Sequence, residues 1–280
     1  MARDSKISWT DSTWNPWIGC HKVSPGCKNC YAETLVENRM GRKFSEIRRA
    51  SPATFNAPLR WNSILGDYET GDMHYVFTCS ISDFFIEEAD AWRDEAWDII
   101  RRTPHLTYQI LTKRPERIAE HLPKMCFSCG VSDTIHAEAM VHSHGFQGWP
   151  WSNVWLGTSV ETQQFAEKRI PELLKVPAVV HFLSCEPLLG PIHFSHDGSI
   201  PIYPPWEVER SYYLLRDIQW VIAGGESGPN FRKMDLDWAH NIRDQCKAAS
   251  VPFFFKQGNG LRSETPCGDP ALDSCKEMPR

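Results

Sequence analysis

The sequence predicts an α/β fold in which parallel strands form a full or partial TIM-like barrel. Three observations carry this prediction. Short apolar runs alternate with longer amphipathic stretches, polar residues follow each apolar run, and 280 residues with 41% hydrophobic content suffice for one large core. Because alternating strands and helices give parallel sheets with right-handed crossovers, we expect a single barrel domain over residues 1–258.

Six short runs rich in β-branched and aromatic residues are predicted to be strands, because each is apolar and too short for a core helix. They cover residues 74–80, 106–112, 153–160, 178–184, 219–225 and 252–257. Three stretches between them have apolar residues at intervals of three and four, which predicts amphipathic helices. These cover residues 88–103, 161–176 and 235–250.

Three segments depart from this alternation. Residues from about 123 to 152 and from about 190 to 213 are rich in Gly, Pro, His and aromatic residues, and we expect them to be insertions over the C-terminal rim of the barrel. Residues 259–280 are expected to form a weakly ordered tail.

Polar residues follow every predicted strand. In a parallel barrel these strand ends meet at one rim, which is where barrel enzymes carry their active sites. The alternative is that the polar residues only mark where strands stop. The rim residues are Ser80, Asp83, Lys113, Arg114, Ser159, Glu161, Ser184, Glu186, Glu226, Ser227, Lys256 and Gln257.

Composition limits the function classes. A formal net charge of -5 and a pI near 6.1 give no overall positive field, so extended binding along a phosphate backbone is not favoured. Apolar runs stay well below the roughly 18 residues of a membrane span, and the first residues lack a secretory signal. We therefore expect a cytoplasmic protein without membrane contact. In that reducing compartment, cysteines act as metal ligands, catalytic thiols or core residues before they form disulfides.

The stretch "NPWIGCHKVSPGCKNCYAE" holds three cysteines, Cys20, Cys27 and Cys30. Structural zinc sites are closed by four ligands, whereas three thiolates can bind three irons of a 4Fe-4S cluster and leave the fourth iron open. The Pro25-Gly26 pair predicts a turn that brings Cys20 back toward the other two cysteines. The alternative is a zinc knuckle completed by a more distant ligand.

This stretch resembles the cluster loop of the radical S-adenosylmethionine (radical SAM) enzymes, in the branch near spore photoproduct lyase. The usual spacing there is Cys-x3-Cys-x2-Cys, whereas this chain has six residues between its first two cysteines. Six further stretches, from "SISDFFIEEAD" to "DQCKAASVPFFFKQ", resemble a phage-associated three-cysteine family of unknown function. This is the phage gp thirty-seven / gp sixty-eight family. The resemblance covers roughly residues 7–258.

The resemblance implies that the three cysteines bind a 4Fe-4S cluster and that its open iron takes the amino and carboxylate groups of S-adenosylmethionine. Reductive cleavage of this cofactor would then give a 5'-deoxyadenosyl radical, with an electron donor such as flavodoxin as partner. Glu226 is expected on the substrate side of the rim. The expected cofactor-binding residues are Ser80, Asp83, Lys113, Glu161 and Glu226.

Two rim carboxylates, Glu161 and Glu186, are candidates for binding ribose hydroxyls, holding a substrate amine or moving a proton. The alternative for each is a helix cap or a salt bridge. Cys185 is a candidate hydrogen-atom donor to a substrate radical, which makes Cys185 and Glu186 the predicted catalytic residues. For Cys185 the alternative is simple packing.

The first insertion contains a second metal-like pattern, in which Cys126 and Cys129 precede three histidines. These are ligand types of structural zinc, although the spacing matches no standard finger. The alternative is a free loop.

Three functional hypotheses follow from the sequence. The first is a radical SAM enzyme acting on a nucleobase, nucleotide or related small molecule in phage or bacterial DNA metabolism, where the nucleic-acid link comes from the resemblance alone. The second is the same chemistry on a peptide or protein partner. The third is a non-catalytic zinc or nucleic-acid-binding module, for which the 12 tryptophans offer stacking surfaces.

Overall fold

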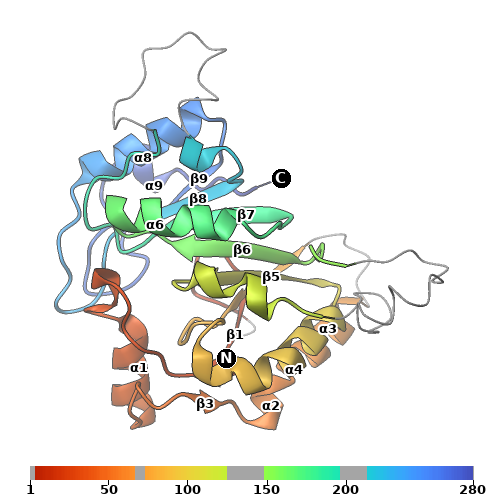
Figure 1. Cartoon of the computed structure of the whole chain (residues 1–280). Helices are drawn as coiled ribbons and strands as arrows, with labels where there is room; N and C mark the ends of the chain where they lie inside the picture. Colours follow the sequence, from red (N-terminus) through yellow and green to blue (C-terminus); the bar gives the residue numbers. More distant parts are fainter. Residues whose placement is uncertain (1–3, 67–72, 125–147, 196–212, 280) are drawn as a thin grey trace.

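The computed structural model describes residues 4–66, 73–124, 148–195 and 213–279. Seven parallel strands form one sheet in the order β1-β4-β5-β6-β7-β8-β9, curled into a half-barrel (Figure 1). The predicted partial TIM-like barrel is confirmed, and all six predicted strands are present. The strands are β1 (Ser12–Trp14), β4 (His74–Thr78), β5 (Leu106–Thr112), β6 (Val154–Ser159), β7 (Val180–Cys185), β8 (Trp220–Gly224) and β9 (Phe253–Gln257).

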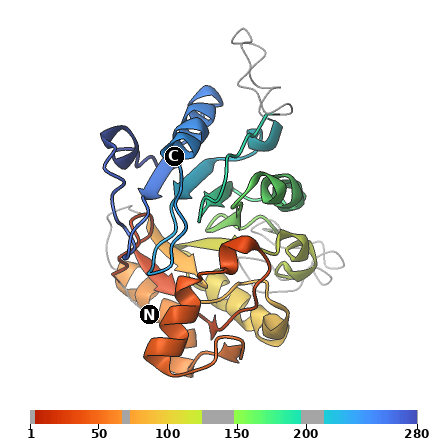
Figure 2. The same cartoon turned by 90° about the vertical axis from the view of Figure 1, so that its left-hand side faces the viewer.

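The three helices that the sequence predicts lie on the outer face of this sheet. Figure 2 shows the strands along an arc with these helices, in yellow, green and blue, outside it. Their inward sides pack fully buried side chains such as Trp97, Ile170 and Ile242 against the sheet. The helices are α4 (Asp90–Arg101), α6 (Gln163–Leu174) and α8 (Leu236–Ala248).

The inner face of the half-barrel is filled by layers of side chains. The strand register places Leu111, Gly157, Phe182 and Trp220 side by side in one layer. A Cβ on Gly157 would lie 2.5 Å from the Phe182 ring, so glycine leaves the space that this ring fills. The next layer toward the carboxyl ends of the strands contains two serines, so the interior becomes more polar toward the rim. That layer consists of Ser159, Ser184, Ile222 and Phe254.

The chain before β4 adds smaller elements that the sequence analysis did not predict. A short antiparallel pair, β2 with β3, and helix α1 flank the cysteine stretch. These elements are β2 (Trp17–Ile18), β3 (Arg48–Arg49), α1 (Tyr31–Met40), α2 (Pro52–Phe55) and α3 (Ala57–Gly66). Short 3-10 helices connect the larger elements: η1 (Pro25–Cys27), η2 (Glu87–Ala89), η3 (Pro115–Arg117), η4 (Ala119–His121) and η5 (Tyr213–Leu215).

The C-terminal segment folds back along β9. The Phe255 amide donates to the Cys275 carbonyl oxygen at 2.9 Å, and Leu272 in the short helix α9 (Pro270–Asp273) is fully buried. Residues 259–279 therefore have defined contacts, whereas composition alone predicts a weakly ordered tail.

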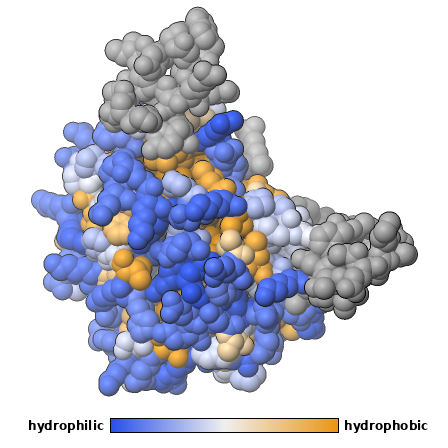
Figure 3. All heavy atoms as spheres, viewed as in Figure 1, coloured by the Kyte–Doolittle hydropathy of each residue, from blue (hydrophilic) through white to orange (hydrophobic). Residues whose placement is uncertain are grey.

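Hydrophilic side chains cover most of the face seen in Figure 3, including the region over α1 and β3 at the lower left. Within the described ranges, every helix is too short or too polar to cross a lipid bilayer.

Candidate active site

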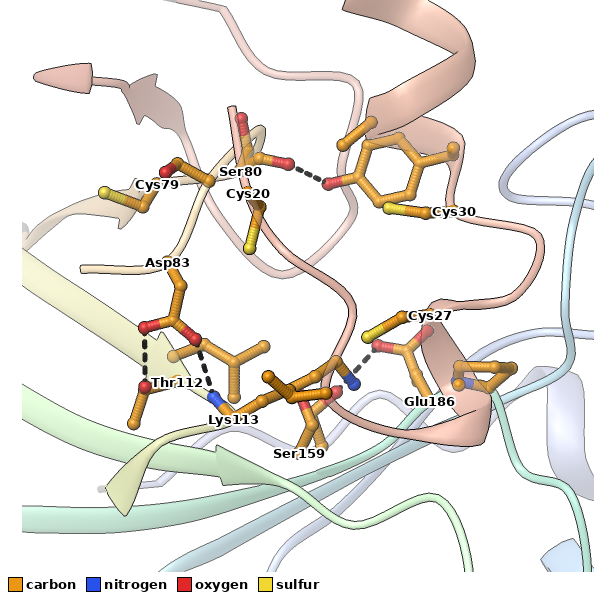
Figure 4. A pocket seen from close by; sticks show the side chains of 18 of the residues that line it. Cys20, Cys27, Cys30, Cys79, Ser80, Asp83, Thr112, Lys113, Ser159 and Glu186 are labelled. Atoms are coloured by element: carbon orange, nitrogen blue, oxygen red, sulfur yellow. Dashed lines mark hydrogen bonds between the residues drawn. The ribbon is translucent and has the colours of Figure 1, made fainter. Parts of the chain in front are cut away.

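A cavity of about 200 Å³ lies at the carboxyl ends of the strands, and the three predicted cluster cysteines line it. Figure 4 shows the sulfur atoms of Cys20, Cys27 and Cys30 facing this space from separate positions around it. The structure brings most of the predicted rim residues to the same cavity. These are Ser80, Asp83, Lys113, Arg114, Ser159, Ser184, Glu186, Glu226, Ser227, Lys256 and Gln257.

The segment that leads to Cys20 is held by the loop after β4. Asn15 Oδ1 accepts a hydrogen bond from the Ile81 amide at 3.0 Å, and Ser82 Oγ donates to the Gly19 carbonyl oxygen at 2.6 Å. Because these bonds join residues more than sixty positions apart, the "NPWIGC" and "SISDFF" stretches form one structural unit.

Gly19 makes the turn before Cys20 feasible. Its φ of +102° lies in a region that side-chain-bearing residues rarely adopt, and an added Cβ would lie 2.7 Å from the Phe44 carbonyl oxygen. That carbonyl also accepts a hydrogen bond from the Cys20 amide at 3.0 Å. The backbone on the N-terminal side of the first cysteine is therefore fixed.

The long spacing between Cys20 and Cys27 is taken up by η1, which rests on Glu161. Ser24 Oγ donates to Glu161 Oε1 at 2.7 Å. An added Cβ at Gly26 would lie 2.5 Å from the same oxygen, so only a glycine allows this approach. The extra residues thus form a turn that is docked on the end of β6.

Glu161 is fully buried and binds two cations. Arg169 Nη1 lies 2.8 Å from Oε2, and the Lys113 ammonium contacts Oε1. Burial alone would raise the pKa of Glu161, but the charges of Lys113 and Arg169 lower it below its ordinary value. Glu161 is therefore an ionised anchor beneath the cysteine loop.

A second carboxylate, Glu226, holds the same loop from the other side. Its Oε2 accepts hydrogen bonds from Asn29 Nδ2 at 3.0 Å and Arg232 Nε at 2.9 Å. Arg232 Nη1 in turn donates to the Pro25 carbonyl oxygen at 3.0 Å. Burial opposes ionisation, yet the bonds from Arg232 and Asn29 lower the pKa of Glu226. Hydrogen bonds to two ion-paired carboxylates, Glu161 and Glu226, therefore attach the loop to the rim.

The carboxylate of Asp83 is occupied by neighbouring groups. Thr112 Oγ1 donates to Oδ1 at 2.7 Å, and the Lys113 amide donates to Oδ2 at 2.9 Å (Figure 4). The Arg114 guanidinium lies 3.1 Å from Oδ2. Asp83 thus connects the loop after β4 to the end of β5.

Glu186 retains some access to the cavity. Its Oε1 lies 3.1 Å from Lys256 Nζ, and Ser184 Oγ donates to Oε2 at 3.3 Å. The Glu186 and Lys256 side chains are 14% and 16% exposed. Ser80 also lines the cavity, and its carbonyl oxygen accepts a hydrogen bond from the Tyr31 hydroxyl. The cavity lining therefore offers both charge signs and hydroxyl groups to a ligand.

Cys185 lies away from the cavity, so we correct its predicted role. Successive strand residues face opposite sides, and Cys185 packs in the outer core while Ser184 faces inward. Burial raises the pKa of Cys185 well above its ordinary value, and Cys246 on α8 adds to this effect. A fully buried thiol in the outer core cannot reach a substrate in the cavity.

Burial favours the neutral thiol at two of the three predicted cluster cysteines, Cys20 and Cys30. Burial, followed by the charge of Asp83, raises the pKa of Cys20 to about 12, while Arg114 opposes the increase. Burial also raises the pKa of Cys30. Across residues 4–66, 73–124, 148–195 and 213–279, no three His, Cys, Asp or Glu side chains are arranged to hold a metal ion. Cys126 and Cys129, the predicted zinc ligands, lie outside the described residues.

Several residues that hold the site were not predicted. Ser24 and Asn29 are polar residues inside the cysteine stretch itself. Their position in that stretch is the sequence signal that could have marked them as site residues. Arg169 lies within a helix, and Arg232 follows Glu226 by six residues. The sequence gives no indication at either position that the side chain contacts the rim.

Comparisons with known proteins identify the family but give no activity. No curated protein matches the chain. Among solved structures, spore photoproduct lyase complexed with dinucleoside spore photoproduct is 13% identical with a TM-score of 0.41, covering 82% of this chain and 58% of that one. Two mutants of spore photoproduct lyase give identities of 10% and 13% and TM-scores of 0.45 and 0.47. The matches cover 88% and 92% of this chain, and 75% and 77% of the two mutant chains.

The model of one protein family, described as a protein of unknown function (DUF5131), matches residues 4–268. That match spans the cysteine loop, the whole sheet and every rim residue described above. The phage association that the sequence resemblance implied stays a prediction. This chain belongs to the DUF5131 family of unknown function.

Proposed function

We propose that this chain is a radical SAM enzyme in which Cys20, Cys27 and Cys30 hold a 4Fe-4S cluster. The observation that carries the proposal is that these three thiols face one cavity at the carboxyl-end rim of a parallel half-barrel. Three thiolates leave one iron of such a cluster open for a cofactor. A cluster is larger than a single ion, so its ligands need not converge on one point.

The residues around the thiols fit this group. A fourth cysteine, Cys79, also lines the cavity, but Figure 4 shows its sulfur pointing away from the other three. The loop that carries the ligands is pinned by Glu161 and Glu226, so it is organised before the cluster binds. When bound, the cluster supplies one electron to S-adenosylmethionine, whose cleavage yields a 5'-deoxyadenosyl radical.

The protein's part in this chemistry is to bind and orient the cofactor and to exclude water. The Lys256–Glu186 pair and the Ser184 hydroxyl offer partners for the carboxylate and amino groups of its methionine end. Lys113, which is 22% exposed and contacts Glu161, is a second cation at the same wall. In this proposal Glu186 contacts the cofactor.

We propose a nucleobase, nucleotide or related small molecule as the substrate. The floor of the cavity is formed by Trp9, Phe77 and Leu111, and the Trp9 and Phe77 ring centroids are 4.6 Å apart. Such apolar and aromatic surfaces favour a planar ring and keep water away from it. An external electron donor such as flavodoxin completes the proposal.

Cysteine substitutions test the cluster assignment. The protein would be reconstituted without oxygen with iron and sulfide, and its metal content measured. Wild type is expected to hold about four irons, and the alanine variants of Cys20, Cys27 and Cys30 to lose most of them. Cys79→Ala is the matched control, because it removes a thiol from the same cavity and should keep the iron.

Two outcomes would contradict the proposal. Iron loss in Cys79→Ala equal to that in the other variants would indicate four protein ligands and no open iron. Zinc in place of iron would favour a structural site instead.

A further inference from the structure

Arg114 joins the first cysteine to the end of β5. Its guanidinium Nη1 lies 3.8 Å from Cys20 Sγ, and Nη2 donates to the His21 carbonyl oxygen at 3.2 Å. The same guanidinium lies 3.1 Å from Asp83 Oδ2, and the side chains of Arg114 and Asp83 are 9% and 6% exposed. A buried cation therefore stands directly beside one of the three thiols.

The carboxylate of Asp83 is fixed by groups outside the cysteine stretch. Its other partners are the Thr112 hydroxyl and the amides of Lys113 and Phe85. These groups belong to the end of β5 and to the loop that carries Asp83 itself. The Asp83 carboxylate can therefore hold the guanidinium of Arg114 in one place beside Cys20.

Cys20 needs such a partner more than the other two thiols. Cys27 ends η1, where its Sγ lies 3.6 Å from Ser24 Oγ, and Cys30 is the N-cap residue of α1. Local helical backbone thus sets the positions of both. Cys20 lies in an irregular segment after β2, and its side chain meets Arg114.

We propose that Arg114 is a positioning residue, held by Asp83, that orients Cys20 and makes the group bound by this thiol easier to reduce. The inference rests on the proposed function, because the cluster is the group that Cys20 would bind. It also gives Asp83 a role other than the direct cofactor contact that the sequence suggested.

The charges predict two shifts of opposite sign. In a site with little water, a nearby positive charge stabilises an added electron, and a negative charge opposes it. Removing the Arg114 charge should therefore make the midpoint reduction potential of the cluster more negative. Removing the Asp83 charge should make it less negative. A purely structural role would not give opposite signs.

The experiment compares reconstituted wild type, Arg114→Met, Asp83→Asn and a control, Arg117→Met. The control removes a neighbouring arginine that contacts Asp90 and the Phe85 carbonyl oxygen but no cluster thiol. Each midpoint potential would be measured by potentiometry with electron paramagnetic resonance detection, without S-adenosylmethionine. We expect the two opposite shifts and no shift in the control. Arg114→Lys, which keeps the charge, should stay near wild type.

The following results would overturn the inference. Wild type that binds no cluster would end both this inference and the proposed function. Cluster-bearing wild type with an unchanged potential in Arg114→Met would end this inference alone. Shifts of the same sign in Arg114→Met and Asp83→Asn would also end it. If Arg114→Met does not fold, the midpoint potentials of Asp83→Asn and Arg114→Lys provide the test. An unchanged midpoint potential in Asp83→Asn would then overturn the inference.

Discussion

Gly26 is a residue where the backbone of the cysteine loop lies directly against the barrel. We expect Gly26→Ala to lose most of its bound iron while remaining folded, because the new methyl group would overlap the buried Glu161 carboxylate. Arg169 holds that carboxylate in place. Iron content and circular dichroism would test this. Gly190→Ala is the control, since an added Cβ there meets no atom within 4 Å.

Glu161 is a residue whose charge matters for stability. Glu161→Gln leaves two cations without their buried counter-charge, so the free energy of unfolding should fall by about 3 kcal/mol. Denaturant unfolding would measure it. Glu172→Gln on α6 removes the partner of the exposed Lys175 and should cost less than about 1 kcal/mol. Equal losses in the two variants would contradict the anchoring role.

The same residue predicts a pH dependence. The folded-state pKa of Glu161 lies below its ordinary value of 4.5, so its ionised form contributes stability above about pH 4.5. This contribution is lost as the pH falls through the folded-state pKa. The stability difference between wild type and Glu161→Gln should therefore be full at neutral pH and shrink in acid. A difference that grows in acid would contradict it.

Site residues could be predicted where they follow a strand, and not where a loop returns from elsewhere. Lys113 comes directly after β5, and parallel strands bring such residues to one rim. Arg232 could not be predicted, because it contacts Pro25, 207 positions away. The error at Cys185 was avoidable, because strand alternation already places it opposite to Ser184.

Among the elements, the C-terminal segment makes a testable contact with the last strand. Leu272 is fully buried against the core, whereas Leu261 in the same segment is 72% exposed. Leu272→Ala should therefore lower the free energy of unfolding by about 2–4 kcal/mol. Leu261→Ala should change it by less than about 0.5 kcal/mol. Thermal unfolding of the two variants would test these values. If neither substitution changes the free energy of unfolding, the segment is not anchored on β9.

Elements with strong periodicity were predictable, and those without it were not. The strand at 106–112 and the three long helices follow from apolar runs and from three-four spacing. β1 has three residues, too few for a pattern, and exists because it pairs with β4. α1 buries only Ala32 and Val36, so it has no apolar stripe that would reveal a helix.

For the whole molecule, alternation of strands and helices predicted the parallel sheet and the single rim. From β4 onward, each strand pairs with the next strand in the chain, as right-handed crossovers favour. The extent of closure could not be predicted, because it depends on strand number and on the stagger between strands.

The most direct test of the proposed function is the cleavage of S-adenosylmethionine. Reconstituted wild type would be reduced with dithionite, without oxygen, and 5'-deoxyadenosine would be measured by chromatography beside Cys30→Ala. We predict that wild type forms 5'-deoxyadenosine and that Cys30→Ala forms none, because only three intact thiols hold the cluster with one open iron. Wild type that carries a full cluster and forms no 5'-deoxyadenosine would contradict the proposal.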